Sequence, residues 1–287
     1  MIYALVTLYN PKDTVVKNMR SLSSQVDKIY LLDNSGLSNA HTFSEIANAE
    51  YVFFNANLGL SEAFNRILKT YKFEDDDFII FFDQDSHIES GHIQTLVAEY
   101  NALKEKNSPI GCLGPAYYNT SSGQIEIPKQ KIKLSEHLYE VKSLITSSML
   151  VQFKMLKEID YWNEDVFLDM ADWDLCWRII ASGKICCMTD SVILQHTLGQ
   201  GEKRILKLRI KIDSPIRAYY QIRDSLYLMN KKYVPLNFRI YFFILLTIRP
   251  LLHFLLLNYK TKRFYYYFRG IYDYCTNKRG EFKNDYF

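Results

Sequence analysis

Two aspartates, Asp83 and Asp85, stand two residues apart where an apolar run, Phe78 to Phe82, gives way to Ser86. Such runs between acidic and turn-forming residues are typical of buried strands in a mostly parallel sheet. Ligands of these sheets collect beyond the carboxyl ends of the strands. Divalent cations prefer oxygen ligands and often bridge to phosphates. The pair therefore predicts either a metal site carrying a diphosphate or two surface carboxylates that cap the next helix.

Further polar and turn-forming residues stand at or just after the ends of the other predicted strands: Thr7, Tyr9, Asn10, Asp33, Asn57 and Gly59. The ring of Tyr9 is suited to stacking on a nucleobase, and Asp33 to accepting a hydrogen bond from a base imide N–H. Asn57 and Gly59 lie where a strand turns into a helix, whose N-terminal amides attract phosphate. The set predicts a nucleotide site at one edge of the sheet.

The elements that position these residues alternate regularly in the first part of the chain. Strand patterns cover residues 2–8, 29–32, 51–54 and 78–82, and helix patterns cover residues 11–24, 59–70 and 89–104. Alternation of this kind indicates right-handed βαβ units around a parallel sheet. We therefore predict an α/β fold whose nucleotide-binding half spans about residues 1–110.

The pattern is looser in the second half, about residues 111–212. Strands are predicted at residues 110–118, 144–153, 185–188 and 192–194, and the polar stretch 119–136 is expected to be mobile. A helix is predicted from Asp172 to Ser182, closed by Gly183. A long helix then begins at Pro215.

The C-terminal region, residues 213–287, has a different composition. An apolar segment, residues 238–257, is interrupted near its centre by Arg249 and Pro250, where a charge costs roughly 2.5–3.5 kcal/mol in lipid. We predict a pair of amphipathic or re-entrant helices rather than a membrane span. Residues 259–269 mix cations with aromatics, which suits an anionic membrane surface. A structural or homo-oligomer contact and single-stranded nucleic acid remain alternatives.

Composition and cysteine usage narrow the class of protein. A net charge of +3 argues against a general nucleic-acid binder. The five cysteines show no Cys-x-x-Cys pair or zinc-finger spacing, which favours a reducing interior over a disulfide framework. The chain opens on a strand pattern without a signal-peptide core, so we expect a cytoplasmic protein at the inner face of the membrane.

Several segments, taken in order, resemble the family 2 glycosyltransferases of the GT-A fold: Val6–Asn10, Asp33–Ser35, Asn57–Asn65 and Asp83–Asp85. Three others resemble the bacterial rhamnosyltransferase branch: Phe82–Ser86, Phe167–Arg178 and Arg217–Asp224. The resemblance covers about residues 2–230. It implies a Rossmann-like nucleotide-diphospho-sugar transferase core over residues 1–212.

The resemblance also implies roles for the acidic residues. Asp85 would ligate Mn²⁺ or Mg²⁺, and Asp83 would contact the ribose or a metal-bound water. Asp172 would be the catalytic base, with Asp169 and Asp174 as competitors for that role or as substrate contacts. The alternative for Asp172 is an N-cap, with Asp174 in the first helical turn.

Other implied roles concern the metal and the acceptor. His196 would complete the metal site. Trp162 and Trp173 would form a sugar platform or pack in the core, and Arg178 would pair with the acidic cluster or the acceptor. Two cations are expected either to close over the diphosphate or to lie in a solvated loop: Lys203 and Arg204.

The resemblance thus implies a metal-dependent inverting glycosyltransferase. Its expected donor is dTDP-β-L-rhamnose, and its expected acceptor is a lipid-linked intermediate of a cell-surface polysaccharide. A UDP-hexose transferase of the same fold and a non-catalytic nucleotide-binding scaffold are the alternatives.

Overall fold

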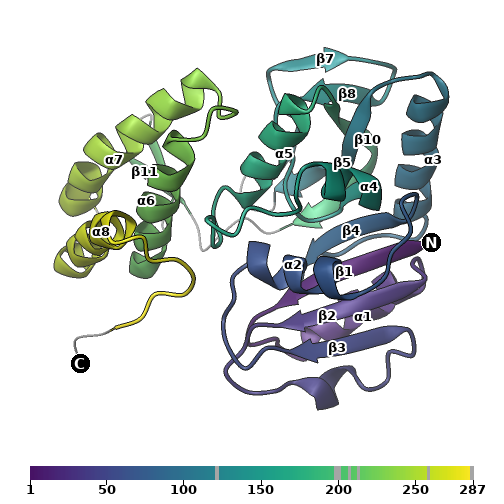
Figure 1. Ribbon diagram of the computed structural model, residues 1–287, viewed down its shortest axis with the longest axis horizontal. Helices are drawn as coiled ribbons and strands as arrows, with labels where there is room; N and C mark the ends of the chain where they lie inside the picture. Colours follow the sequence, from purple (N-terminus) through teal and green to yellow (C-terminus); the bar gives the residue numbers. More distant parts are fainter. Residues whose placement is uncertain (120–122, 197–201, 206–207, 212–213, 257–258, 285–287) are drawn as a thin grey trace.

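The computed structural model describes residues 1–119, 123–196, 202–205, 208–211, 214–256 and 259–284. A ten-stranded mixed sheet forms the centre of the larger part of the molecule (Figure 1). Its strands are β1 (Ile2–Leu8), β2 (Lys28–Asp33), β3 (Ala49–Phe53), β4 (Phe78–Asp83), β5 (Ile110–Asn119), β6 (Gln124–Glu126), β7 (Lys131–Lys133), β8 (Leu138–Val141), β9 (Met149–Gln152) and β10 (Ile185–His196).

The strand order is β3-β2-β1-β4-β9-β5-β10-β8-β7, with β6 paired to β5. The first four strands in this order are parallel, as the alternating pattern predicted. Strand β9 is antiparallel to both β4 and β5, so the second half is mixed. The register places Thr7 opposite Asp83 and Leu8 opposite Asp33, which brings three polar strand ends to one edge.

Helices cover both faces of the sheet and bury two apolar layers. One layer packs α1 (Thr14–Ser23) and α3 (His92–Glu105) against the sheet. The other packs α2 (Ser61–Thr70), α4 (Phe153–Glu158) and α5 (Ala171–Ala181) against the opposite face. The short 3-10 turn η1 (Ala40–Phe43) follows β2. The strands that end at the polar edge are therefore fixed from both sides.

Three predictions about the second half need correction. The strand predicted at residues 144–153 is limited to β9 and runs directly into α4. The polar stretch 119–136 contains β6 and β7 among its described residues. The two strands predicted at 185–188 and 192–194 are one strand, β10, whose register against β5 shifts between Thr189 and Ile193. Residues 190–192 bulge there, which is why the pattern looks broken.

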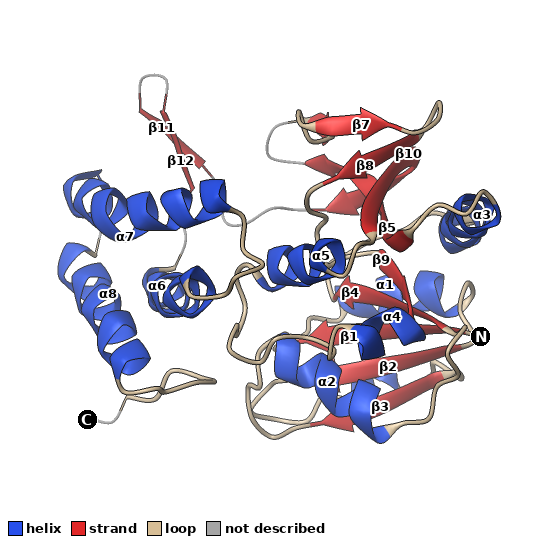
Figure 2. Cartoon of the chain, turned by 45° about the horizontal axis from the view of Figure 1, so that its top comes forward, coloured by secondary structure: helices blue, strands red, loops and turns tan. Residues whose placement is uncertain are grey.

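Three C-terminal helices pack beside the sheet: α6 (Pro215–Met229), α7 (Leu236–Leu256) and α8 (Lys260–Cys275) (Figure 2). The pair of helices predicted at residues 238–257 is a single helix, α7, which contains Pro250. Among the described residues, no helix combines the length and the apolar character needed to cross a membrane. A small antiparallel hairpin, β11 (Glu202–Ile205) and β12 (Leu208–Lys211), precedes α6.

Candidate active site

The turns after β1 and β4 are tied to each other at the polar edge. The Tyr9 backbone N–H donates to Gln84 Oε1 at 2.9 Å, and Gln84 Nε2 donates back to the Tyr9 carbonyl at 3.3 Å. The Asn10 N–H donates to Ser35 Oγ at 2.7 Å. The Tyr9 ring is exposed above these backbone contacts. The edge thus has a fixed backbone and an accessible aromatic face, as a base-stacking residue requires.

Asp33 is completely buried and organises the turn after β2. Its carboxylate accepts hydrogen bonds from the Ser35 N–H at 2.8 Å, from Asn39 Nδ2 at 2.9 Å and from the Tyr51 hydroxyl. In this conformation the Asp33 carboxylate stabilises the turn after β2. The predicted contact with a base imide therefore stays a prediction.

Asn34 connects this turn to the start of α2. Its Nδ2 donates to the Gly59 carbonyl at 3.0 Å, and its Oδ1 accepts the Leu58 N–H at 3.1 Å. Asn57 Oδ1 accepts the Gly59 N–H at 3.1 Å. Gly59 has φ +74°, and a Cβ there would lie 2.4 Å from the Phe167 carbonyl oxygen. Only glycine fits this crossing of two loops.

The turn after β4 carries Asp83 and Asp85. Ser147 orients the first, because its Oγ donates to Asp83 Oδ2 at 2.7 Å and accepts the Asp83 N–H at 3.2 Å. Asp85 lies exposed on the turn that follows. Two carboxylates at an accessible strand end are a hard-oxygen donor set that fits Mn²⁺ or Mg²⁺.

The end of β10 lies beside this turn. His87 and Gln195 exchange backbone hydrogen bonds, each 3.4 Å long, as an antiparallel bridge. His196 follows Gln195 directly, so its backbone enters the neighbourhood of Asp85. Its side chain lies outside the described residues, as do those of Lys203 and Arg204, whose backbone belongs to β11. Their predicted roles stay predictions.

Asp172 lies in the first turn of α5, one residue after the helix begins. Its Oδ1 accepts the Trp173 N–H at 2.8 Å, and the N-cap is Met170, which has φ +69°. The N-cap alternative for Asp172 is therefore wrong. Burial raises the pKa of Asp172 to about 7, and the charges of Cys176, Asp169 and Asp83 add to the shift. Asp83 at the turn after β4 thus lies close enough to Asp172 to raise its pKa.

Asp169 is held next to this carboxylate by Arg217. Nε of the arginine lies 2.9 Å and 3.0 Å from the two Asp169 oxygens, and its NH2 lies 2.6 Å from Oδ1. This is a bidentate pair, which fixes both side chains. Asp169 is therefore neutralised, whereas Asp172 keeps an elevated pKa suited to proton transfer near pH 7.

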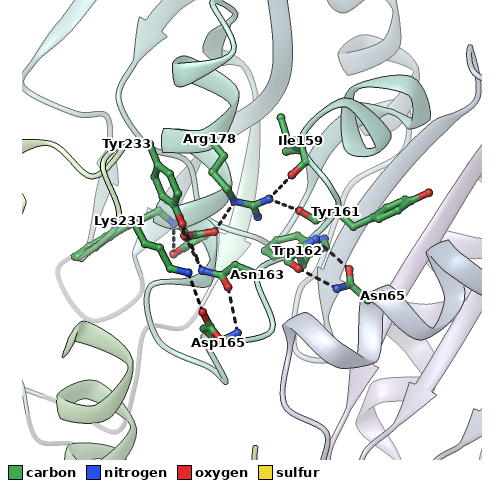
Figure 3. Close-up of polar contacts among 12 residues, drawn as sticks. Asn65, Ile159, Tyr161, Trp162, Asn163, Asp165, Arg178, Lys231 and Tyr233 are labelled. Carbon is green, nitrogen blue, oxygen red and sulfur yellow. Dashed lines mark hydrogen bonds and ion pairs between the residues drawn. The ribbon is translucent and has the colours of Figure 1, made fainter. Parts of the chain in front are cut away.

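Two predicted substrate contacts are instead part of the framework. Asp174 is fully buried, and its oxygens accept from Arg178 Nε at 2.7 Å, the Tyr233 hydroxyl at 2.6 Å and Asn163 Nδ2 at 3.1 Å. Figure 3 shows Arg178 reaching onward from this pair to two backbone carbonyls, those of Ile159 and Tyr161. The predicted pairing of Arg178 with the acidic cluster is confirmed, and a role of either residue in acceptor binding is not supported.

The two tryptophans also have packing partners. Trp162 is buried, with its ring centroid 4.9 Å from that of Phe81 and 5.1 Å from that of Phe64. Trp173 packs on Phe238 of α7 at 5.1 Å. Trp162 offers no face to a sugar, so the core alternative holds for it. Trp173 is half-buried at the junction of α5 with α7.

Sequence reasoning missed several residues that shape the site. Asn34 and Arg217 lie inside segments that resemble the family, but the sequence alone did not indicate that they position the loops around the site. Ser147 gave no signal, because a serine in a loop is common and its contact with Asp83 spans 64 positions. The role of Asn34 could have been predicted, because an asparagine in a turn after a strand commonly forms hydrogen bonds with nearby backbone.

Residues 3–159 match the model of the family described as "Glycosyl transferase family 2". This match spans more than half of the 287 residues. The chain belongs to glycosyl transferase family 2. A curated relative from Shigella flexneri, "dTDP-rhamnosyl transferase RfbF", is 26% identical over 250 residues, which cover 82% of each chain.

Two solved glycosyltransferases have the same fold as this family 2 member. S. aureus TarS 1–349 in complex with UDP-GlcNAc superposes with TM-score 0.56 and 16% identity, covering 95% of this chain and 80% of TarS. GalNAc-T7 with UDP, GalNAc and Mn²⁺ gives TM-score 0.56 and 12% identity over 84% of this chain. The match covers only 53% of the GalNAc-T7 chain. The predicted GT-A fold and glycosyltransferase class are confirmed.

Proposed function

We propose that this glycosyltransferase is metal-dependent and inverting, and that it transfers L-rhamnose from dTDP-β-L-rhamnose. The observation that carries the mechanism is the placement of Asp172, whose raised pKa reflects its burial and its nearness to Asp83. A single base opposite a diphosphate site suits a one-step displacement, which inverts the anomeric centre. The donor rests on the relative that is named a dTDP-rhamnosyl transferase.

In this proposal each carboxylate has one task. Asp172 takes the proton of the acceptor hydroxyl as it attacks the anomeric carbon. Asp83 and Asp85, with His196, would hold a divalent ion that stabilises the charge of the leaving diphosphate. Tyr9 stacks on the base, and the loop at Asn57 and Gly59 receives the phosphates at the start of α2.

The choice of Asp172 over its neighbours follows from their partners. Asp169 is paired bidentately with Arg217, and Asp174 is saturated by Arg178, Tyr233 and Asn163. The oxygens of these two carboxylates are therefore occupied by partners of the protein itself, which leaves them poorly placed to take a proton from an acceptor. Asp172 accepts a backbone N–H and has no such cation among its contacts in the described residues.

Calorimetric binding of dTDP-rhamnose, UDP-glucose and UDP-galactose, each with and without Mn²⁺, tests the donor and the metal together. We expect metal-dependent binding of dTDP-rhamnose in the wild type and its loss in Asp85→Ala. Preference for a UDP-sugar would keep the mechanism and reject the rhamnosyl assignment. Binding without turnover on any acceptor would favour the non-catalytic scaffold.

We further propose that residues 213–287 hold the enzyme at an anionic membrane, where a lipid-linked acceptor is available. Exposed apolar side chains recur along α7 at helical spacing: Leu236, Ile240, Phe243, Ile244, Ile248, Leu251 and Leu255. Residues 225–272 contain no acidic residue. Lys260 and Lys262 are exposed at the start of α8. An apolar stripe next to exposed cations matches the interface of anionic lipid.

Co-sedimentation with vesicles tests this surface. We expect binding to phosphatidylglycerol vesicles that weakens with salt and falls severalfold in Ile248→Asp. Ile132→Asp is the matched control, because both isoleucines are about half exposed, at 49% and 58%, and Ile132 lies on β7. A concentration-dependent dimer without vesicle binding would replace the membrane with a homo-oligomer contact. Salt-sensitive binding of single-stranded RNA in its place would favour the nucleic-acid alternative.

A further inference from the structure

Three cysteines from distant parts of the chain meet between α5 and the strands β5 and β10. The sulfur atoms of Cys112 on β5, Cys176 on α5 and Cys186 on β10 all lie within 4.8 Å of one another. All three side chains are completely buried. Cys112 and Cys186 face each other directly across the parallel β5–β10 pair, and α5 brings Cys176 onto them. We call these residues the thiol cluster.

The contacts of the thiol cluster favour an electron-rich sulfur at its centre. The Leu144 backbone N–H donates to Cys176 Sγ at 3.4 Å, and the Cys186 thiol donates to the Cys176 carbonyl at 3.6 Å. Hydrogen bonds among the three thiols lower the pKa of Cys176 well below its usual range and raise the pKa of Cys112 and of Cys186 well above it, so Cys176 is the first of the three to become a thiolate. Thiolates are the form in which cysteine binds metals.

The spacing fits a shared ion. Three sulfurs on one ion at about 2.3 Å lie roughly 3.8–4.0 Å apart. Separations of up to 4.8 Å need about an ångström of contraction or less, which side-chain rotation can supply. Sulfur ligands select soft ions of the Zn²⁺ and Cu⁺ type, whereas Mg²⁺ and Mn²⁺ prefer oxygen. The thiol cluster and the Asp83–Asp85 turn therefore suit different ions.

We propose that Cys112, Cys176 and Cys186 bind one soft, thiophilic d¹⁰ cation that fastens α5 to β5 and β10. Each thiol that becomes a ligand loses its S–H proton to solvent, and no electron is transferred. The bound ion joins an element that carries Asp172, one turn before Cys176, to the two central strands behind it. The inference is independent of the donor and acceptor proposed above.

Titration of the full-length reduced protein with Cd²⁺, Zn²⁺ and Cu⁺ tests the site. We expect a thiolate-to-Cd²⁺ ultraviolet charge-transfer band that saturates at one equivalent, together with a rise in Tm. Both should be lost in Cys176→Ala and kept in Cys275→Ala, which removes an exposed cysteine. Zn²⁺ and Cu⁺ then compete for the Cd²⁺ band, which gives the affinity of the site for each of the two ions. A band that persists in Cys176→Ala, or none at one equivalent, overturns the proposal.

A second measurement needs no variant, in case Cys176→Ala fails to fold. In mild urea, one equivalent of Cd²⁺ should slow alkylation of Cys112, Cys176 and Cys186 together, as read by peptide mass spectrometry. Cys187 is the internal control, because it is buried on the same strand but packs in the other apolar layer. Equal protection of Cys187, or protection of a single cysteine, would show that the three sulfurs do not share an ion.

Discussion

The turn after β2 and the loop that leads into α5 are held by different kinds of contact. Asp33 and Asn34 bond to partners 2 to 25 positions away in sequence. The loop from Asp165 to Asp169 is held by α6 and the residues that follow it. Its partners Arg217, Lys231 and Arg279 are 48, 66 and 114 positions away. The turn after β2 is therefore held by residues nearby in sequence, whereas the loop that leads into α5 depends on the C-terminal region.

Phe167 is where the two regions meet. Its carbonyl accepts the Leu60 N–H at 2.8 Å, and its own N–H donates to Asp224 Oδ2 at 2.9 Å. Its ring stacks on Tyr220 of α6 with centroids 4.4 Å apart. Phe167 thus connects the C-terminal helix α6 directly to the loop at Gly59.

Asp172→Asn is expected to give the largest effect on catalysis. Loss of a general base lowers kcat by roughly 10²–10⁴-fold, while donor affinity stays unchanged, because the base acts on the acceptor hydroxyl. Steady-state kinetics and calorimetry measure the two separately. Asp76→Asn, which changes an exposed carboxylate paired with Lys104 and Lys154, is the control. Unchanged kcat in Asp172→Asn would exclude this residue as the base.

Arg223→Met tests the long-range support. Arg223 and Asp224 are both fully buried and form an ion pair of 2.8 Å. Leaving a buried carboxylate without its partner costs about 3–5 kcal/mol of unfolding free energy. Urea unfolding measures it. The exposed pair Arg66–Glu62 gives the comparison, since Arg66→Met should cost about 0.5 kcal/mol or less. An equal loss of unfolding free energy in the two variants would show that the buried pair stabilises the fold no more than the exposed pair does.

Gly59→Ala tests the contact between the two regions. A non-glycine residue with positive φ costs about 1–3 kcal/mol, and the new Cβ would also displace Phe167. We expect weaker donor binding and lower stability, read by calorimetry and thermal unfolding. Gly36→Ala is the control, because a Cβ there meets nothing within 4 Å. Wild-type donor affinity in Gly59→Ala would show that the close contact between Gly59 and Phe167 is not needed for donor binding.

The pH dependence of kcat/KM gives the smallest and most specific effect. The base acts when deprotonated, and the pKa of Asp172 is raised to about 7. Activity should therefore rise with pH up to that value and fall about tenfold per unit below it. A pH-rate profile from 5 to 8 measures this slope. A profile that stays flat down to pH 5 would assign the base to a group with an ordinary carboxyl pKa.

The success of the sequence reasoning follows the same division. The strands at Ile2–Leu8 and Phe78–Asp83, and the polar residues at their ends, were predicted because their signals are local. The framework role of Asp174 was not predicted, because a motif does not reveal which of its side chains face inward. The partners that bury Asp174 include Tyr233, 59 positions away.

The sequence by itself determined the βαβ order, the acidic pair after β4, the family and the acidic character of the α5 start. Each is carried by neighbouring residues, whose spacing sets the period of the element and the place where it ends. Only the tertiary structure decided that Asp172 has a raised pKa, that Ser147 orients Asp83, and that three cysteines meet. Those outcomes depend on burial and on contacts between distant segments, which chain packing alone creates.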